Sequence, residues 1–450
     1  MIENLKEKVA DAATKKDGSI QHTTGKSVVL FPFTTSTGSP ENYSEVSTKN
    51  TFVASVIRQL CGLKLSKPVN KDEVEERIIK MVDTDSAKDL KHIVRHVAFD
   101  SSGDLLPFCE KAFLYVGGGE KKPAELANYF LNLYLNDSFE CLKGKFNDPI
   151  EDIFHKLVLK SFPELEKKVP KKGEKNYPVT DRLRSSFIID LKSLCSGHRL
   201  RVQDLKKLFI YYLFAHHVEV ALRFHRALRG RGGRDIPLYT MEWEKVSASR
   251  EGYMGGWRRI EHCRKQLFSM SVCSELLNCT SVANEIGLLG YSEWVQLKDN
   301  IDIDKETQLV KEIGIICDEY KTLINDVNWE GFKPTQPSGE VLVDSLRTLH
   351  EMVNYQFYNS SRKAAAGRYN DWLLALASRN FLKSRGRIGR TLTLTREWFL
   401  FLASLCAQSH GGRIRLSDFW DELQKRGVGL DHDSKLSAVS LLDRLGLLEK

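Results

Sequence analysis

Amphipathic segments with a repeat close to 3.6 residues follow one another through most of this 450-residue sequence. This pattern constrains the fold more than any other feature, because apolar residues at that spacing form one face of a helix. The longest segment runs from Val202 to about Leu228. Its inner face carries Leu205, Leu208, Phe209, Tyr212, Leu213, Ala215, Val220 and Leu222. Strand signals are scarce, so the sequence predicts a mainly α protein.

Length and local composition divide the chain into parts. A chain of this length exceeds one typical domain, so we expect a multidomain protein. Residues 163–178 contain five lysines and three prolines, a composition typical of an exposed linker, although these lysines could also contact phosphates. The expected parts are an N-terminal helical domain (1–162), a Lys/Pro-rich linker (163–178), a central helical domain (179–384) and a winged-helix-like domain (385–450).

The C-terminal segment has the element order of a winged-helix domain, a relative of the helix-turn-helix. Thr395 is expected to cap a first helix, and residues 413–416 alternate like a short strand. Ser417 with Asp418 is expected to cap a second helix, and Asp431 opens a third. The inner face of the third helix is assigned to Leu436, Val439, Leu442 and Leu445, and the wing would follow Leu447.

A winged helix can either read DNA or dock a protein. The outer face of the third helix mixes Lys435 and Arg444 with serines and several aspartates. It lacks the Arg-rich or Asn/Gln-rich character that reads base edges. Phosphate contact or protein docking is therefore favoured over base reading.

Positive charge is concentrated in two segments of a chain whose formal net charge is +8. Residues 199–234 carry nine Lys or Arg against two acidic residues, and residues 362–390 carry eight against one. Focused basic patches on an otherwise mixed surface are typical of proteins that contact polyanions. The alternative is that each patch pairs with acidic surface of this chain or of a partner subunit.

Gly/Arg-rich runs supply the candidate binding residues. Glycine lets a backbone approach phosphates, and arginine can hold a phosphate with two hydrogen bonds. In `GGWRR`, Trp257 stands beside two arginines, a composition that could stack on a base and hold its phosphates. The candidate nucleic-acid-binding residues are Arg229, Arg231, Arg234, Trp257, Arg258, Arg259, Arg385, Arg387, Arg390 and Lys435.

Motifs with catalytic, cofactor or metal chemistry are incomplete. `TTGKS` (23–27) resembles the end of a P-loop, but the first glycine is replaced by Ile20 and an apolar extended segment follows. His92 and His96 share a helical face without further ligands, and His262 with nearby cysteines lacks a zinc spacing. We therefore expect no catalytic residue, no cofactor and no metal.

Irregularly spaced cysteines, nine in number, fit a reducing compartment better than a disulfide framework. No apolar run approaches the roughly 20 residues that span a bilayer, and the charged N-terminus is not a signal peptide. The expected location is the cytoplasm, without membrane contact.

Two stretches resemble the G component of the DNA phosphorothioation-dependent restriction system, the DptG-like family. They are `EWEKVSASREGYMGGWRRIEHCRKQLFSMSVCSELLN` (242–278) and the C-terminal stretch from 385 to 450. The resemblance implies a non-enzymatic DNA-contacting and scaffolding subunit, which acts on unmodified DNA with ATPase and nuclease partner subunits. Its partners would be the duplex DNA backbone and those subunits. The alternative is a pure protein-interaction adaptor without DNA contact.

Overall fold

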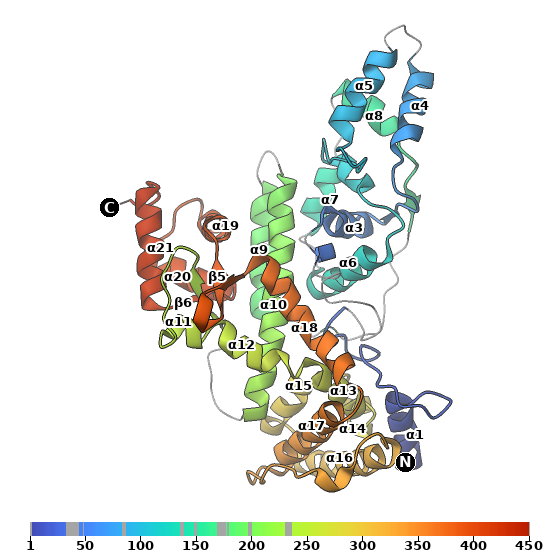
Figure 1. The fold of residues 1–450 in the computed structure, drawn as a ribbon, viewed down its shortest axis with the longest axis vertical. Coiled ribbons are helices and arrows are strands. Elements are labelled where there is room, and N and C mark those ends of the chain that lie inside the picture. The colour runs from blue at the N-terminus through green and yellow to red at the C-terminus, as the bar shows by residue number, and fades with distance from the viewer. Residues whose placement is uncertain are drawn as a thin grey trace.

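A computed structural model describes residues 2–32, 45–47, 49–82, 87–135, 139–147, 150, 152–168, 177, 180–196, 200–229 and 236–449. The chain is mainly helical with two small sheets, as the periodicity predicts (Figure 1). Every helix in these residues is too short or too polar to cross a membrane.

The 28-residue helix α10 (Val202–Arg229) runs through the middle of the molecule (Figure 1). All eight residues assigned to its inner face are buried, and Ile210, Tyr211 and Phe214 are buried as well. A helix that is apolar on all sides must be surrounded. The surrounding helices are α3 (Asn50–Leu60), α9 (Asp181–Ser196), α12 (Trp257–Arg264), α15 (Tyr291–Gln296) and α18 (Lys363–Asn380).

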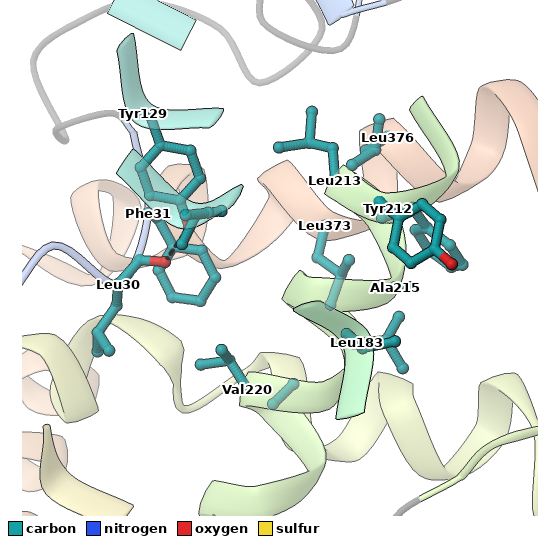
Figure 2. Packing of buried hydrophobic residues seen from close by; sticks show 14 of the residues in the cluster. Leu30, Phe31, Tyr129, Leu183, Tyr212, Leu213, Ala215, Val220, Leu373 and Leu376 are labelled. Atoms are coloured by element: carbon teal, nitrogen blue, oxygen red, sulfur yellow. Dashed lines mark hydrogen bonds between the residues drawn. The ribbon is translucent and has the colours of Figure 1, made fainter. Parts of the chain in front are cut away.

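Close packing around α10 draws in residues from distant parts of the sequence. Figure 2 shows Leu213 of α10 close to Leu373 and Leu376 of α18. On the other side, the Tyr129 hydroxyl donates to the Leu30 carbonyl at 2.7 Å. The core is therefore continuous from the N-terminal segment to α18.

At one end of α10 lies a helical layer that includes the N-terminal helix α1 (Ile2–Ala13). Helix α1 packs against α16 and α13, which come from the central part of the sequence. The predicted boundary at 163–178 remains a prediction, but α1 belongs with central helices. The other elements of this layer are α13 (Leu267–Leu277), α14 (Ser281–Ile286), α16 (Ile303–Leu323), α17 (Val341–Asn359) and the 3₁₀ turns η2 (Leu297–Asp299) and η3 (Trp329–Gly331).

Toward the opposite end, a distal lobe formed by α4, α5 and α8 has an apolar cluster separate from the main core (Figure 1). The segment that leads into this lobe passes close to glycines 117–119, and a Cβ on Gly118 would lie 2.5 Å from the Lys67 carbonyl oxygen. Within the predicted linker, β2 (Glu166–Lys167) pairs with β1 (Leu63–Lys64). The helices of this half are α4 (Lys71–Met81), α5 (Ala87–Ala98), η1 (Lys111–Tyr115), α6 (Lys121–Tyr134), α7 (Phe139–Asn147) and α8 (Ile153–Lys160).

The C-terminal lobe is built on a four-stranded sheet in the order β4-β5-β3-β6. Strand β3 pairs in parallel with β5 and β6, and β4 pairs antiparallel with β5. Its strands are β4 (Leu382–Ser384), β5 (Arg390–Leu394), β6 (Gly429–Leu430) and β3 (Leu238–Met241), and its helices are α19 (Arg396–Gln408), α20 (Leu416–Lys425) and α21 (His432–Arg444).

Two of the three helix caps predicted for this lobe are found at the predicted residues. The side chain of Thr395 accepts from the Trp398 amide, and that of Asp431 accepts from the Ser434 amide. The cap at Ser417 and Asp418 is wrong, because α20 already begins at Leu416 and Arg415 occupies the N-cap position. Local capping chemistry therefore places α19 and α21 correctly and misplaces the start of α20 by a few residues.

A winged-helix domain is not confirmed. The strand expected at 413–416 is wrong: residues 413–415 pair with no strand of the described chain, Arg413 and Arg415 are exposed, and Ile414 is half-buried against the core. An inner position of the sheet is taken instead by β3, from a distant part of the sequence. Of the residues assigned to the inner face of α21, Leu442 is buried as predicted, Val439 and Leu445 are half-buried, and Leu436 is 57% exposed. The buried face also carries Ser434, Ala438 and Leu441.

A buried charge network fastens the C-terminal lobe to the central helices. Arg426, which follows α20, is fully buried and donates to the Asp190 carboxylate of α9, with the shortest contact at 2.6 Å. It also donates to the Glu422 carboxylate at 2.5 Å. Tyr212 donates to Asp190 at 2.7 Å and Tyr211 donates to the Arg426 carbonyl at 2.6 Å. These directional bonds fix the sheet against α9 and α10.

Candidate nucleic-acid interface

The polycationic run at the start of the C-terminal segment forms a hairpin between β4 and β5. Its turn contains the short 3₁₀ helix η4 (Gly386–Ile388). Gly386 and Gly389 have φ of +61° and +86°, a backbone conformation that favours glycine. The Arg385 amide donates to the Gly389 carbonyl at 2.7 Å and closes the turn. The glycines thus shape a tight turn that leaves Arg387 and Arg390 exposed.

Arg385 points inward and has a different role from the one predicted. Its Nη2 donates to the Met241 carbonyl at 2.9 Å and its Nη1 to the Glu244 carbonyl. Its Nε donates to the Thr391 hydroxyl at 3.2 Å, and burial lowers the pKa of the guanidinium. Arg385 therefore holds the segment after β3 against the hairpin, and its assignment as a phosphate contact is corrected.

Trp257 is buried, with 3% of its surface exposed, so its indole cannot stack on a base. It is the first residue of α12, which packs against α10 and β5. A Cβ on the preceding Gly256 would lie 2.6 Å from the carbonyl oxygens of Gly252 and Leu238. The glycine therefore serves close backbone packing, and the stacking role predicted for Trp257 is wrong.

Arg258 remains on the surface and lies near the hairpin. Its guanidinium lies 5.8 Å from the centre of the Tyr253 ring. The Tyr253 hydroxyl donates to the Ile388 carbonyl at 2.7 Å, which joins α11 (Glu251–Met254) to the hairpin turn. Arg258, Arg387 and Arg390 consequently surround one corner, named here the hairpin corner. In the described residues no carboxylate forms an ion pair with any of these three.

The remaining predicted residues do not join this corner. Arg259 is half-buried and makes a contact of its own. Lys435 lies over the Trp420 ring at 5.6 Å, beside a cavity of about 610 Å³ along β6, at the other edge of the sheet. Arg231, Arg234 and the side chain of Arg229 lie outside the described residues.

Trp243 is an exposed aromatic residue that is not among the binding residues predicted from the sequence. It is 37% exposed in the turn that follows β3, and Lys383 and Arg385 reach the carbonyl groups around it. Its position within the charged run `EWEK` was the available signal. Trp257 therefore belongs to the core, whereas Trp243 lies on the cationic surface.

Arg250 shows the opposite arrangement from the hairpin corner. It is 9% exposed and donates to Asp431 through Nε and Nη2, both at 2.8 Å. Glu244 pairs with the same guanidinium at 2.8 Å. Burial opposes the charged form of Asp431, yet hydrogen bonds from Arg250 and Ser434 lower its pKa to about 2. This cation is neutralised inside the chain.

The neighbouring cavity lies at the carboxyl ends of β3 and β6, where parallel sheets commonly bind ligands. It measures about 510 Å³ and is lined in part by Lys245, Arg250, Glu251 and Asp431. The Arg250 and Asp431 charges on its wall are already paired with each other. These two buried charges are therefore not available to a charged ligand.

The segment that resembles a P-loop end already holds an anion of its own chain. The buried Glu275 carboxylate accepts from the backbone amides of Lys26 at 2.7 Å and Ser27 at 3.0 Å. Amides that converge on one point form an anion site in phosphate-binding loops. Here a carboxylate fills that site. Among the described residues no group of three or more His, Cys, Asp or Glu is arranged to hold a metal.

Neither the scan against protein-family models nor the search of curated proteins finds a match for this chain.

Proposed function

We propose that this chain is a non-enzymatic, DNA-contacting and scaffolding subunit of a restriction complex. The observation that carries the proposal is the hairpin corner, where Arg258, Arg387 and Arg390 are exposed without carboxylate partners in the described chain. Backbone phosphates bind such cations with release of counterions. The short turn of the hairpin and the Tyr253 contact fix the positions of these cations.

The resemblance to the DptG-like family supports the wider setting of the proposal. Its two stretches meet at this corner, because Tyr253 of the first contacts Ile388 of the second. In that setting ATPase and nuclease subunits act beside this chain on DNA without the phosphorothioate mark. Helices α19, α20 and α21 would contribute a docking unit related to the helix-turn-helix. The nine cysteines, all free thiols, support the cytoplasm as the location.

A gel-shift series with duplex DNA at increasing salt concentration tests the contact. The variant R258A/R387A/R390A should bind more weakly, and the slope of log K against log salt should fall by roughly 2 to 3, about 0.9 for each lost phosphate contact. The matched control K80A/K156A/K160A removes three exposed lysines from the distal lobe and should leave the slope unchanged. Wild-type binding that does not weaken with salt would contradict the proposal.

A second candidate is a pure protein-interaction adaptor. The distal lobe favours it, since Ile79, Met81, Ile93 and Ile153 are exposed there, Ile153 by 82%. Scattered exposed apolar residues are normal, but several on one small lobe are typical of contact surfaces. In this case the chain shows no DNA affinity at any salt concentration and co-purifies with an ATPase subunit. Ile93→Asp with Ile153→Asp should then release that partner, whereas R258A/R387A/R390A should not.

A further inference from the structure

We propose that Trp243 is a stacking platform for an unpaired base, so that the hairpin corner takes single-stranded or locally opened DNA in preference to closed duplex. This inference rests on the proposed function, because it names the form of nucleic acid that the same surface accepts.

Trp243 differs from the other tryptophans. All seven lie in the described residues, and Trp243 alone is among the exposed large apolar side chains. Trp257, Trp294, Trp372 and Trp398 are buried in the core. Exposing a large aromatic ring forfeits the stabilisation that burial would give, so its position calls for a reason beyond core packing.

The turn that carries Trp243 is fixed from both sides. Its amides are used: Glu242 donates to the Leu394 carbonyl at 2.9 Å and Glu244 to the Met241 carbonyl at 3.2 Å. Its carbonyls are used as well, since Lys383 donates to the Glu242 carbonyl at 2.7 Å and Arg385 to those of Met241 and Glu244. An indole on so constrained a backbone loses little conformational entropy when a base stacks on it.

The surrounding charges suit a polynucleotide chain. Lys383 and Arg385 bring the hairpin against the Trp243 turn, and the same hairpin presents Arg387 and Arg390 to solvent. The exposed Glu242 beside Trp243 disfavours a phosphate directly at the indole. The arrangement therefore places a base against Trp243 and the following phosphates along the hairpin corner, the aromatic and cationic pairing typical of single-strand binders.

Duplex DNA cannot use this platform in the same way. Its bases are stacked on one another, so a protein aromatic ring reaches a base face only where the strand is open. Trp243 should therefore contribute to single-strand affinity and add little to duplex affinity, which depends on the arginines alone.

Fluorescence anisotropy with a short labelled oligothymidylate and a duplex of equal length tests this inference. W243A should lower single-strand affinity by roughly 10- to 100-fold, the range expected for one lost stack, and change duplex affinity by less than about twofold. W243F keeps an aromatic face and should retain most of the single-strand affinity. Y358A removes a side chain that is 49% exposed on α17 and should change neither.

The outcomes separate the two proposals. Equal losses on both DNA forms, or a single-strand affinity that W243A leaves unchanged, overturn the stacking inference while DNA contact stands. The same holds if W243F loses as much as W243A, since aromatic character would then be irrelevant. Absence of binding to both forms by the wild type overturns DNA contact itself, and the inference with it.

Discussion

The guanidinium of Arg426 and those of the hairpin corner have the same chemistry but opposite surroundings. Arg426 is fully buried between Asp190 and Glu422 and joins the C-terminal lobe to α9. Arg387 and Arg390 lie at the rim of the same lobe, exposed and without an ion-pair partner in the described chain. A buried charge without its partner strongly destabilises the protein, whereas an exposed charge can gain or lose a partner with little change in free energy. The difference separates the residues that hold the lobe from those that can bind another molecule.

The largest expected effect is destabilisation by acid, which acts on histidines in the interior of the protein and not on the exposed hairpin corner. Burial lowers the pKa of His22 and His350 to about 3 and, against one hydrogen bond to a backbone carbonyl, that of His217 to about 4. The unfolded chain binds protons from about pH 6.5 downward, so it holds more protons than the folded chain between that pH and about 4. Each histidine should therefore remove roughly 1 kcal/mol of stability per pH unit in that window.

Urea unfolding at a series of pH values between 7 and 5 measures this loss. His350→Gln should reduce the pH dependence of the unfolding free energy by the amount expected for one bound proton. His92→Gln, the same substitution at an exposed position, is the matched control variant. Asp431, with its pKa near 2, contributes stability that is lost only below about pH 4, as the pH falls toward that value. A flat profile from pH 7 to 5 would contradict the prediction.

Removing the buried guanidinium should have the next largest effect. Arg426→Ala leaves the buried Asp190 carboxylate without a cation, while Glu422 keeps only Lys425, and removing one partner of a buried ion pair destabilises by about 3–5 kcal/mol. Urea unfolding at neutral pH measures it. Arg444→Ala, an exposed position on α21, should change stability by less than about 0.5 kcal/mol. A loss below about 1 kcal/mol for Arg426→Ala would mean that the network contributes little.

Gly256 tests whether glycine near the corner serves packing or binding. A Cβ there would lie 2.6 Å from two carbonyl oxygens, so Gly256→Ala should destabilise by about 1–3 kcal/mol. Gly367→Ala is the control: this α18 glycine has open space around its Cβ position, and the change should be neutral or stabilise by up to about 1 kcal/mol. Thermal unfolding of both variants compares them. Equal melting temperatures would show that the backbone yields at Gly256.

The hairpin corner should show the smallest effect on stability. Replacing Arg387 and Arg390 by alanine removes no ion pair of the described chain, so stability should stay within about 0.5 kcal/mol of wild type. DNA affinity should fall in the same variant, which separates binding from folding. A large loss of stability would show that these arginines stabilise the fold as Arg426 does, and that they are not free for binding alone.

Local signals predicted local structure well. The apolar face of α10 and the caps at Thr395 and Asp431 depend on neighbouring residues, and all were found where expected. The sheet was missed because β3 is four residues long and pairs with strands some 150 and 190 residues later. A strand without its partners carries little signal of its own.

The candidate site was predicted in part for the same reason. Arg385 and Arg387 are two residues apart in one basic run, yet the turn directs the first inward and the second to solvent. Trp243 and Trp257 both stand among charged residues, and only tertiary packing decides which is exposed. Composition identified the corner, but it could not assign roles to individual side chains within it.

The insertion of β3 between β5 and β6 has a consequence for how the protein matures. During synthesis residues 238–241 emerge long before residues 390–430. This apolar strand therefore has no partner strand until β5 and β6 have been synthesised. Closing so long a loop is slow, and an unpaired edge invites association with other chains. A C-terminal fragment expressed alone would have an empty groove in place of its middle strand, and supplying the β3 segment as a peptide in trans would be the natural way to rescue it.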